Sequence, residues 1–472
     1  MTGETKLKLK AKAFHFLPHF KPRTFLIVAS LCAAPAVVRG QAIWLPGSDP
    51  ANIARSGAGV AFGRSLEACS LNPALLVTVQ GSNSVYLATG MELQSTQLTM
   101  PSNERQLFST DRNRFMPALG GCWQYTKKLA FGVRVDTPYM RHLEIPLESP
   151  SRFFGHSFDL KSMRSEMQAA YAITDAFSIG LSVGTTSLNY ASAVSLRALV
   201  PVDPSHPAGD ANPVEALLET IAKQEGSVTA PTFSVGLRYA ITSRWTFGGS
   251  FTSGAKGRPS LAASMGDEVS FYGKGQPDSI PDLGIEDRAQ AMMALLSAQP
   301  GAGDISMPYK IQAGIRHRLN QATTWELDLR YIGASSASVP TQAELKTPSG
   351  TVTTLDRNYE FRDALALSAM IEITLNKNWA VRAGFSYDPE ARDEQEIEAM
   401  LGGAKSAGFS IGLARRLFGG ELSAGYQYRQ AEDVIANNVG GNWTSSGLSY
   451  SGTPAKVEGM GHLLSIGYKK SF

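Results

Sequence analysis

The stretch WELDLRY, residues 325–331, alternates apolar and charged side chains at every step. Its odd-numbered positions hold Trp, Leu, Leu and Tyr, and its even-numbered positions hold Glu, Asp and Arg. A β-strand turns successive side chains to opposite faces, so this pattern predicts a strand with one apolar and one charged face.

The same alternation recurs in residues 129–136, 233–241, 311–316 and 379–388. Apolar faces of this kind either cover one another in a soluble sandwich or face lipid in a membrane barrel. Aromatic residues at the ends of the apolar faces, such as Trp245, Trp379 and Tyr239, favour the barrel, where they form interfacial girdles. The last segment ends on Phe472, which resembles the assembly signal of bacterial outer-membrane proteins.

Alternation and turn residues together give about fourteen strands, joined by short turns that alternate with long loops, as in outer-membrane barrels. We therefore predict an all-β fold, a transmembrane antiparallel β-barrel. The expected strands span 83–95, 112–126, 128–140, 158–174, 176–199, 226–241, 244–256, 304–319, 322–338, 357–375, 378–390, 404–417, 420–433 and 456–472.

Composition excludes several other classes of protein. The 472 residues include 44 basic and 41 acidic side chains, a net charge of +3, which argues against a nucleic-acid-binding protein. Three cysteines are too few for a disulfide scaffold. No histidine lies in a nucleophile motif, and no zinc-type spacing or phosphate-binding loop occurs, so we expect neither an enzyme nor a cofactor or metal site. Cys69 and Cys122 could form a disulfide or serve as small buried side chains.

Residues 1–42 have the pattern of a secretory signal peptide: a basic start, an apolar stretch of about 15 residues and small residues at the end. That stretch is shorter than the roughly 20 residues a spanning helix needs. We predict export, cleavage near Ile43 and insertion into the bacterial outer membrane.

Residues 43–82 precede the first expected strand and are too apolar for a free tail, which favours an N-terminal plug, or hatch, inside the barrel lumen. The barrel itself would span 83–472. Its long loops at about 200–225 and 257–303 carry helical patterns at 213–222 and 285–296. These two helices would pack on each other or the rim, or would frame an apolar groove that captures a ligand. The groove residues would be Leu217, Leu218, Ile221, Met292, Met293 and Leu296.

The motif Asn72-Pro73-Ala74 before the first strand, together with residues 307–333 and 361–390, resembles the FadL/TodX family of outer-membrane transporters for long-chain fatty acids and other hydrophobic compounds. The resemblance implies a hatch that closes the lumen, a low-affinity groove outside, and a deep pocket near the mature N-terminus. Ile43, Trp44 and Leu45 would lie at that pocket. Movement of the N-terminus would open a lateral route through the barrel wall into the membrane.

A fatty-acid carboxylate would favour an inward-facing arginine, and Arg316 and Arg382 are candidates together with Arg134, Arg238 and Arg330. The alternative is that these arginines pair with inward acids such as Asp136, Glu326, Asp328 and Glu372 and hold the plug in place.

The expected partners are hydrophobic small molecules and outer-membrane lipid, with no nucleic acid, and a closed barrel predicts a monomer. The transport reading competes with two others, a general diffusion porin for polar solutes and a surface-binding barrel that transports nothing.

Overall fold

The computed structural model describes most of the chain from Leu45 to Phe472. The segments that it leaves out are 1–44, 46, 63–65, 80, 82, 100–104, 110–113, 145–155, 202–214, 274–296, 341–343, 347–351, 357–360, 392–404, 432, 440–441, 446–447 and 451–452. The predicted signal peptide, Ile43, Trp44, Met292, Met293 and Leu296 all lie outside the described residues.

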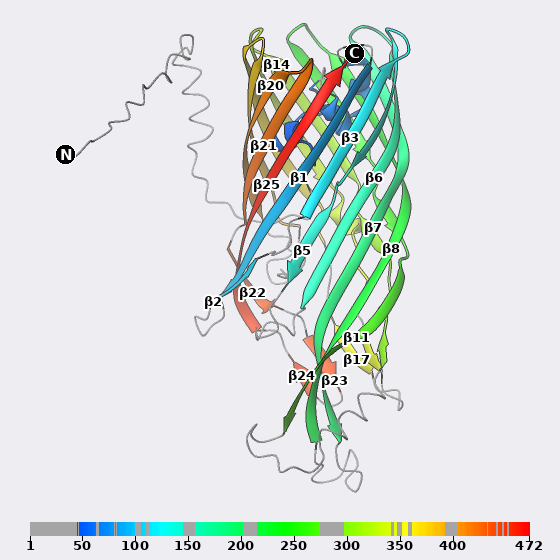
Figure 1. The fold of residues 1–472 in the computed structure, drawn as a ribbon, viewed down its shortest axis with the longest axis vertical. Coiled ribbons are helices and arrows are strands. Elements are labelled where there is room, and N and C mark those ends of the chain that lie inside the picture. The colour runs from blue at the N-terminus through cyan, green and yellow to red at the C-terminus, as the bar shows by residue number, and fades with distance from the viewer. Residues whose placement is uncertain are drawn as a thin grey trace, which may run out of the picture. The chain divides into compact units, whose positions relative to one another are not determined.

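Among the described residues, fourteen antiparallel strands form a closed ring, which confirms the predicted barrel (Figure 1). Ring closure comes from β25, which pairs with β21 on one side and with β1 on the other. In ring order the strands are β1 (Asn83–Thr99), β3 (Arg114–Gln124), β4 (Leu129–Asp136), β6 (Ser157–Ala172), β7 (Phe177–Pro201), β8 (Glu215–Ala240), β9 (Trp245–Thr252), β14 (Lys310–Arg318), β15 (Thr323–Ile332), β18 (Ala364–Asn376), β19 (Trp379–Asp388), β20 (Ser406–Leu417), β21 (Gly420–Ala431) and β25 (Thr453–Ser471).

The apolar faces of the strands are exposed around the outside of the ring. On β15, Leu327 and Leu329 are 40% and 48% exposed, whereas Glu326 and Asp328 between them are 1% and 0% exposed. A soluble sandwich would show the reverse, because its apolar faces would be buried against each other. The exposed apolar face and buried charged face are those of a membrane barrel.

Short turns and long connections lie at opposite ends of the barrel. The turn between β3 and β4 lies at the same end as the C-terminus, because Ser84 of β1 pairs with both Cys122 and Ser471. We call this the turn end, and we call the opposite end, where the long connections lie, the loop end.

The predicted helix at 213–222 is wrong, because all of its described residues from 215 onward belong to β8. Leu217 pairs with Leu199 of β7 on one side and with Tyr272 of β11 (Ser260–Gly273) on the other. Two neighbouring strands therefore satisfy its backbone groups, and this tertiary pairing overrides a ten-residue helical pattern. The loop at 257–303 is likewise strand at its described ends, and the helix predicted at 285–296 lies outside the described residues.

Further short strands extend the barrel or lie beside it. They are β2 (Arg105–Ser109), β5 (Met140–Glu144), β10 (Ala255–Gly257), β12 (Ser297–Gln299), β13 (Ile305–Met307), β16 (Glu344–Lys346), β17 (Val352–Asp356), β22 (Val434–Val439), β23 (Asn442–Ser445) and β24 (Leu448–Tyr450). A 3₁₀ turn, η4, covers Ala334–Ser336. Within the described part of the chain, no helix is both long and apolar enough to cross a membrane.

The described N-terminal segment, which runs from residue 45 to 79 with short gaps, contains α2 (Pro50–Ala54), η1 (Glu67–Ser70) and η2 (Pro73–Thr78). It packs on the inner face of the barrel wall, where glycines make room for it. A Cβ on Gly180 would lie 2.4 Å from the backbone of Pro73 and Ala74, and one on Gly248 would lie 2.2 Å from the Val60 carbonyl oxygen. Glycine at these positions allows the segment's backbone to approach the wall directly.

Replacing Gly180 should displace η2 from the wall. We expect Gly180→Ala to weaken docking of the N-terminal segment by about 1–3 kcal/mol, because the new methyl group overlaps backbone atoms. Trypsin cleavage after the buried Arg55 in detergent-solubilised protein measures this. Gly121→Ala is the matched control, since its Cβ would have no neighbour closer than 3.7 Å. Equal cleavage rates in the two variants would contradict the close fit.

Candidate functional site

Asn72, the first residue of the Asn72-Pro73-Ala74 motif, is fully buried and binds three backbone groups. Its Oδ1 accepts a hydrogen bond from the Ala74 N–H at 3.0 Å and so caps η2. Its Nδ2 donates to the carbonyl oxygens of Val60 at 2.8 Å and of Leu237 on β8 at 2.9 Å. Pro73 occupies the first turn, where a missing N–H does no harm. The motif thus ties two parts of the N-terminal segment to the barrel wall.

A pair of buried carboxylates on β15 holds the glycine-rich part of the same segment. The Asp328 carboxylate accepts from the N–H groups of Gly59 at 2.8 Å and Val60 at 3.1 Å. Glu326 accepts from the next N–H, that of Ala61, at 2.6 Å. Hydrogen bonds to ionised acceptors are among the stronger ones in proteins. Three consecutive backbone donors are therefore fixed by one strand.

A chain of alternating charges gives a further attachment. Arg55 contacts Glu372 of β18 at 2.9 Å, and Arg382 of β19 contacts the same carboxylate at 2.6 Å. The chain continues from Arg382 through Glu421 and Lys469 to Glu67, with contacts of 3.1, 3.5 and 3.2 Å. It starts and ends on the N-terminal segment. Arg382, a candidate for the ligand carboxylate, is therefore engaged with two acids.

We expect Asn72→Ala to loosen the N-terminal segment by about 2–3 kcal/mol, because it removes one cap and leaves two buried carbonyl groups without their donor. Hydrogen exchange at residues 73–78 measures the change. Asn320→Ala is a matched control, since Asn320 caps only the exposed turn before β15. Similar exchange at residues 73–78 in both variants would show that the motif does not hold the segment.

The other candidate arginines also have partners on the inner face. Arg134 contacts Glu166 at 2.8 Å, and Arg330 contacts Asp388 at 2.7 Å. The guanidinium group of Arg316 lies 5.1 Å from the ring centre of Phe62, which Arg55 also approaches at 3.9 Å. The contacts of Arg134, Arg330 and Arg382 with acids match the alternative that the sequence left open, in which inward arginines pair with inward acids.

The predicted capture groove is not assembled by the described residues. Leu217, Leu218 and Ile221 lie on β8, and of these Ile221 is buried. Met292, Met293 and Leu296, their expected counterparts, lie outside the described residues. The groove between two helices is therefore withdrawn for the first of its two sides.

The barrel wall has a break beside β3. The ladder between β3 and β4 runs only from Gln124↔Ala130 to Leu119↔Val135. Beyond that pair, residues 114–118 of β3 remain paired with β1, and β5 pairs only with β6. Within residues 114–144, all of which the structure describes, the facing edges 114–118 and 137–144 share no ladder. We call this stretch the wall break.

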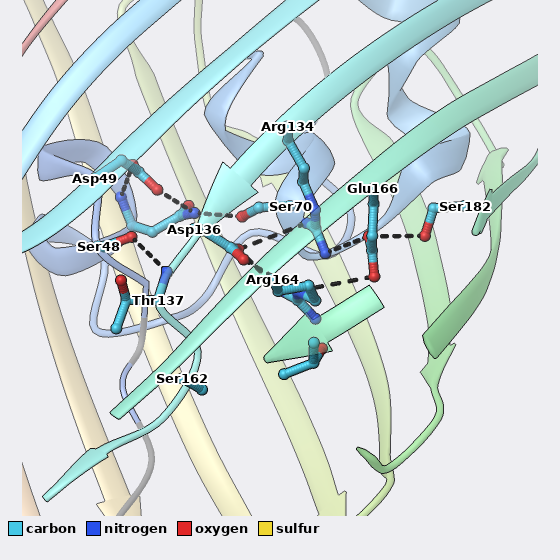
Figure 2. Close-up of polar contacts among 12 residues, drawn as sticks. Ser48, Asp49, Ser70, Arg134, Asp136, Thr137, Ser162, Arg164, Glu166 and Ser182 are labelled. Carbon is cyan, nitrogen blue, oxygen red and sulfur yellow. Dashed lines mark hydrogen bonds and ion pairs between the residues drawn. The ribbon is translucent and has the colours of Figure 1, made fainter. Parts of the chain in front are cut away.

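A cluster of polar contacts fixes the wall at the point where the break begins (Figure 2). Arg164 of β6 binds Asp136, the last residue of β4, at 3.0 and 2.8 Å, and Arg134 binds Glu166 at 2.8 Å. Ser182 of β7 donates to Glu166 at 2.9 Å. These contacts pin β4 to β6 as far as Asp136, so the chain leaves the β3 edge directly after that residue.

The start of the N-terminal segment lies at the wall break. The Leu45 N–H donates to the Pro138 carbonyl oxygen at 3.3 Å, and the Thr137 N–H donates to Ser48 Oγ at 3.4 Å. The Leu45 side chain packs on an apolar cluster that consists of Ile53, Met116 of β3, Met140 of β5 and Leu463 of β25. Leu45 thus lies beside a buried apolar site, as the resemblance implied for a deep pocket.

Sequence reasoning missed Met116, Met140, Leu463 and the neighbouring Arg141, which is 1% exposed and donates to Gln94 Oε1 at 3.1 Å. Two prolines were the available signal. Pro117 lies inside β3 and Pro138 follows β4, and proline supplies no N–H to a ladder. Prolines within two adjacent strand segments mark a place where pairing stops.

Asp49 is a buried carboxyl group at the start of α2 (Figure 2). It accepts from the Asn52 backbone N–H at 2.9 Å and from Asn52 Nδ2 at 2.7 Å. Burial, and after it the nearby Glu67 carboxylate, raise the pKa of Asp49 from 3.8 to about 7. The neutral form is therefore favoured when the segment is docked.

The raised pKa of Asp49 predicts that docking weakens as the pH rises. Its stabilising contribution is complete below the ordinary pKa near 4 and is lost by about pH 7, where the docked carboxyl ionises. Exchange protection at residues 50–54, corrected for the intrinsic pH dependence of exchange, should fall by up to about tenfold per pH unit in this window. Asp49→Asn should flatten the profile, and Asp304→Asn should not. An unchanged slope in Asp49→Asn would assign the pH dependence to another group.

Comparisons with known proteins place this geometry in a family. A family model described as "Outer membrane protein transport protein (OMPP1/FadL/TodX)" matches residues 34–472. The chain belongs to the FadL/TodX family of outer-membrane transport proteins. The comparison with curated proteins gives no match.

Solved structures of FadL/TodX proteins have the same fold. The chain shares 15% identity and a TM-score of 0.66 with a FadL homologue from Pseudomonas aeruginosa, over 92% of this chain and 100% of that one. For the P. putida toluene transporter TodX the values are 14%, 0.58, 92% and 99%. For the Ralstonia pickettii toluene transporter TbuX they are 16%, 0.55, 91% and 99%. At these identities the likeness establishes the fold.

Proposed function

We propose that this FadL/TodX-family barrel takes up hydrophobic compounds, either long-chain fatty acids or aromatic hydrocarbons, and releases them sideways into the outer membrane. The observation that carries the proposal is the wall break next to the apolar cluster of Leu45, Ile53, Met116, Met140 and Leu463. An apolar ligand gains roughly 0.8 kcal/mol for each buried methylene group, so such a cluster retains it where a water-filled lumen would not.

The proposed exit leads from this cluster through the wall break to lipid. Phe115, on the outward face of the same β3 edge, is 61% exposed. It borders an apolar hollow of about 710 Å³ on the outside of the barrel, to which Met91, Leu464 and Ile466 also contribute. A ligand that passed the break would therefore meet a surface that suits acyl chains.

In the same proposal the N-terminal segment is the hatch that closes the lumen. Its attachments to β8, β15 and β18 are polar and buried, which suits a permanent closure. Its first residues, in contrast, reach the wall break through one backbone hydrogen bond and one serine hydroxyl. Displacing residues 45–48 alone would uncover the cluster, while the rest of the hatch stayed in place.

Deleting residues 45–76 should convert a closed barrel into an open pore. We expect single-channel conductance in planar bilayers to rise at least tenfold, because the segment that fills the lumen is gone. Loss of specificity for apolar solutes should accompany the change. An equally large conductance of the full-length protein would favour the general diffusion porin.

Uptake of labelled oleate and labelled toluene by cells that carry the protein tests the apolar cluster. Leu463→Asn should lower uptake of the transported probe by about tenfold, since a polar amide would face the ligand. Leu319→Asn, at an exposed turn, is the matched control. If neither probe enters faster than in cells without the barrel, the non-transporting alternative holds.

A further inference from the structure

Three polar side chains bridge the wall break at its loop end. Arg114 is the first residue of β3, and both of its Nη atoms donate to the Asp159 carboxylate on β6. Its Nη2 also lies 2.8 Å from Nδ1 of His142 on β5. His142 and Asp159 are cross-strand partners in the β5–β6 ladder. One arginine thus ties the free edge of β3 to the strand pair on the other side of the break.

These contacts limit the length of the wall break. At its turn end the break stops at the ladder pair Leu119↔Val135, where ordinary strand pairing resumes. Between this pair and Arg114, Met116 and Met140 meet in the apolar cluster. Apolar contact carries little preference for one separation, whereas an ion pair with a second hydrogen bond has a defined geometry. The distance between the edges at the loop end is therefore set by Arg114.

The tautomer of His142 follows from the contact with Arg114. A guanidinium group can only donate, so Nδ1 must accept and His142 must be neutral in this arrangement. A protonated imidazole has no acceptor, and its positive charge would stand next to that of Arg114. It would also compete for the Asp159 carboxylate, whose Oδ2 is 3.8 Å from Nδ1.

We propose that Arg114, His142 and Asp159 form a latch across the loop end of the wall break, and that protonation of His142 loosens it. The proposal rests on the lateral route described above, whose opening the latch regulates. A looser latch lets the β3 edge move away from β5, which widens the path between the apolar cluster and the lipid. Histidine is suited to this role because its ordinary pKa is near 6.5.

The charged groups around His142 determine the direction of the change. On β5 itself Arg141 precedes it and the Glu144 carboxylate lies 4.0 Å from its Nε2. On β6, Asp159 and Lys161 lie on the facing edge. On β1, Glu92 is paired with Arg114 across the ladder. The two acids nearest to the ring, Glu144 and Asp159, both belong to the β5–β6 side. They stabilise a protonated His142 there, and the contact with β3 is the one that weakens.

Hydrogen exchange in detergent-solubilised full-length protein, without ligand, tests the latch. We expect protection at residues 115–118 and 140–144 to fall by about three- to tenfold between pH 8 and pH 5.5, the range for one partly exposed charged contact. His142→Gln, which retains an acceptor but does not titrate, should remove this pH dependence. Arg114→Gln should show low protection at both pH values. Arg258→Gln, which breaks an exposed ion pair with Asp304, should behave like the unmodified protein.

Each outcome bears on one proposal. Heat-modified migration in gels confirms that every variant forms a barrel. Protection that is independent of pH in the unmodified protein, or a dependence that survives in His142→Gln, would overturn the latch. Because this readout needs no ligand, a protein that imports neither oleate nor toluene but shows the expected exchange would refute the transport function and leave the latch intact. Asp49 acts in the opposite direction and on residues 50–54, so the two pH effects are separable.

Discussion

Every backbone donor and acceptor at membrane depth needs a partner within the protein, and this requirement governs the rest of the structure. Thirteen of the fourteen strand junctions in the ring meet it by continuous pairing among the described residues, and the junction between β3 and β4 meets it only in part. Irregular backbone is tolerated at this depth only where protein covers it. Here Leu45 and Ser48 supply the partners of Pro138 and Thr137, so the N-terminal segment completes the wall as well as filling the lumen.

How much of this the sequence could reveal depends on the distance over which each feature is encoded. The alternation at 325–331 is local, and it correctly predicted a strand whose charges face inward. The helical pattern at 213–222 is equally local but misled, since Leu217 is held by Leu199 and Tyr272. The wall break depends on which segment lies beside residues 114–118, and no local pattern encodes that neighbour. Pro117 and Pro138 signalled an interruption but could not show that both lie at the same junction.

The candidate site divides in a similar way. Asn72-Pro73-Ala74 was recognisable as a motif, and the structure adds its physical reason, since Asn72 binds Ala74, Val60 and Leu237 at once. The arginines were found by parity, but parity cannot tell a ligand-binding arginine from one that is already paired. Arg382 lies between Glu372 and Glu421, and a ligand carboxylate would have to displace one of them. This favours an apolar contact, rather than Arg382, as the main source of ligand affinity.

The two ends of the described N-terminal segment are attached with unequal strength, and this inequality bears on how a hatch could open. Residues 55–61 are held by buried carboxylates on β15 and β18, and breaking such contacts one partner at a time leaves a buried charge unpaired. Residues 45–48 are held by neutral hydrogen bonds and by an apolar cluster that a ligand of similar character can enter. An apolar ligand can replace Leu45 in that cluster without leaving a charge or a hydrogen-bonding group unsatisfied. We infer that the ligand itself displaces the first residues of the hatch, and that the remainder of the segment never leaves the lumen.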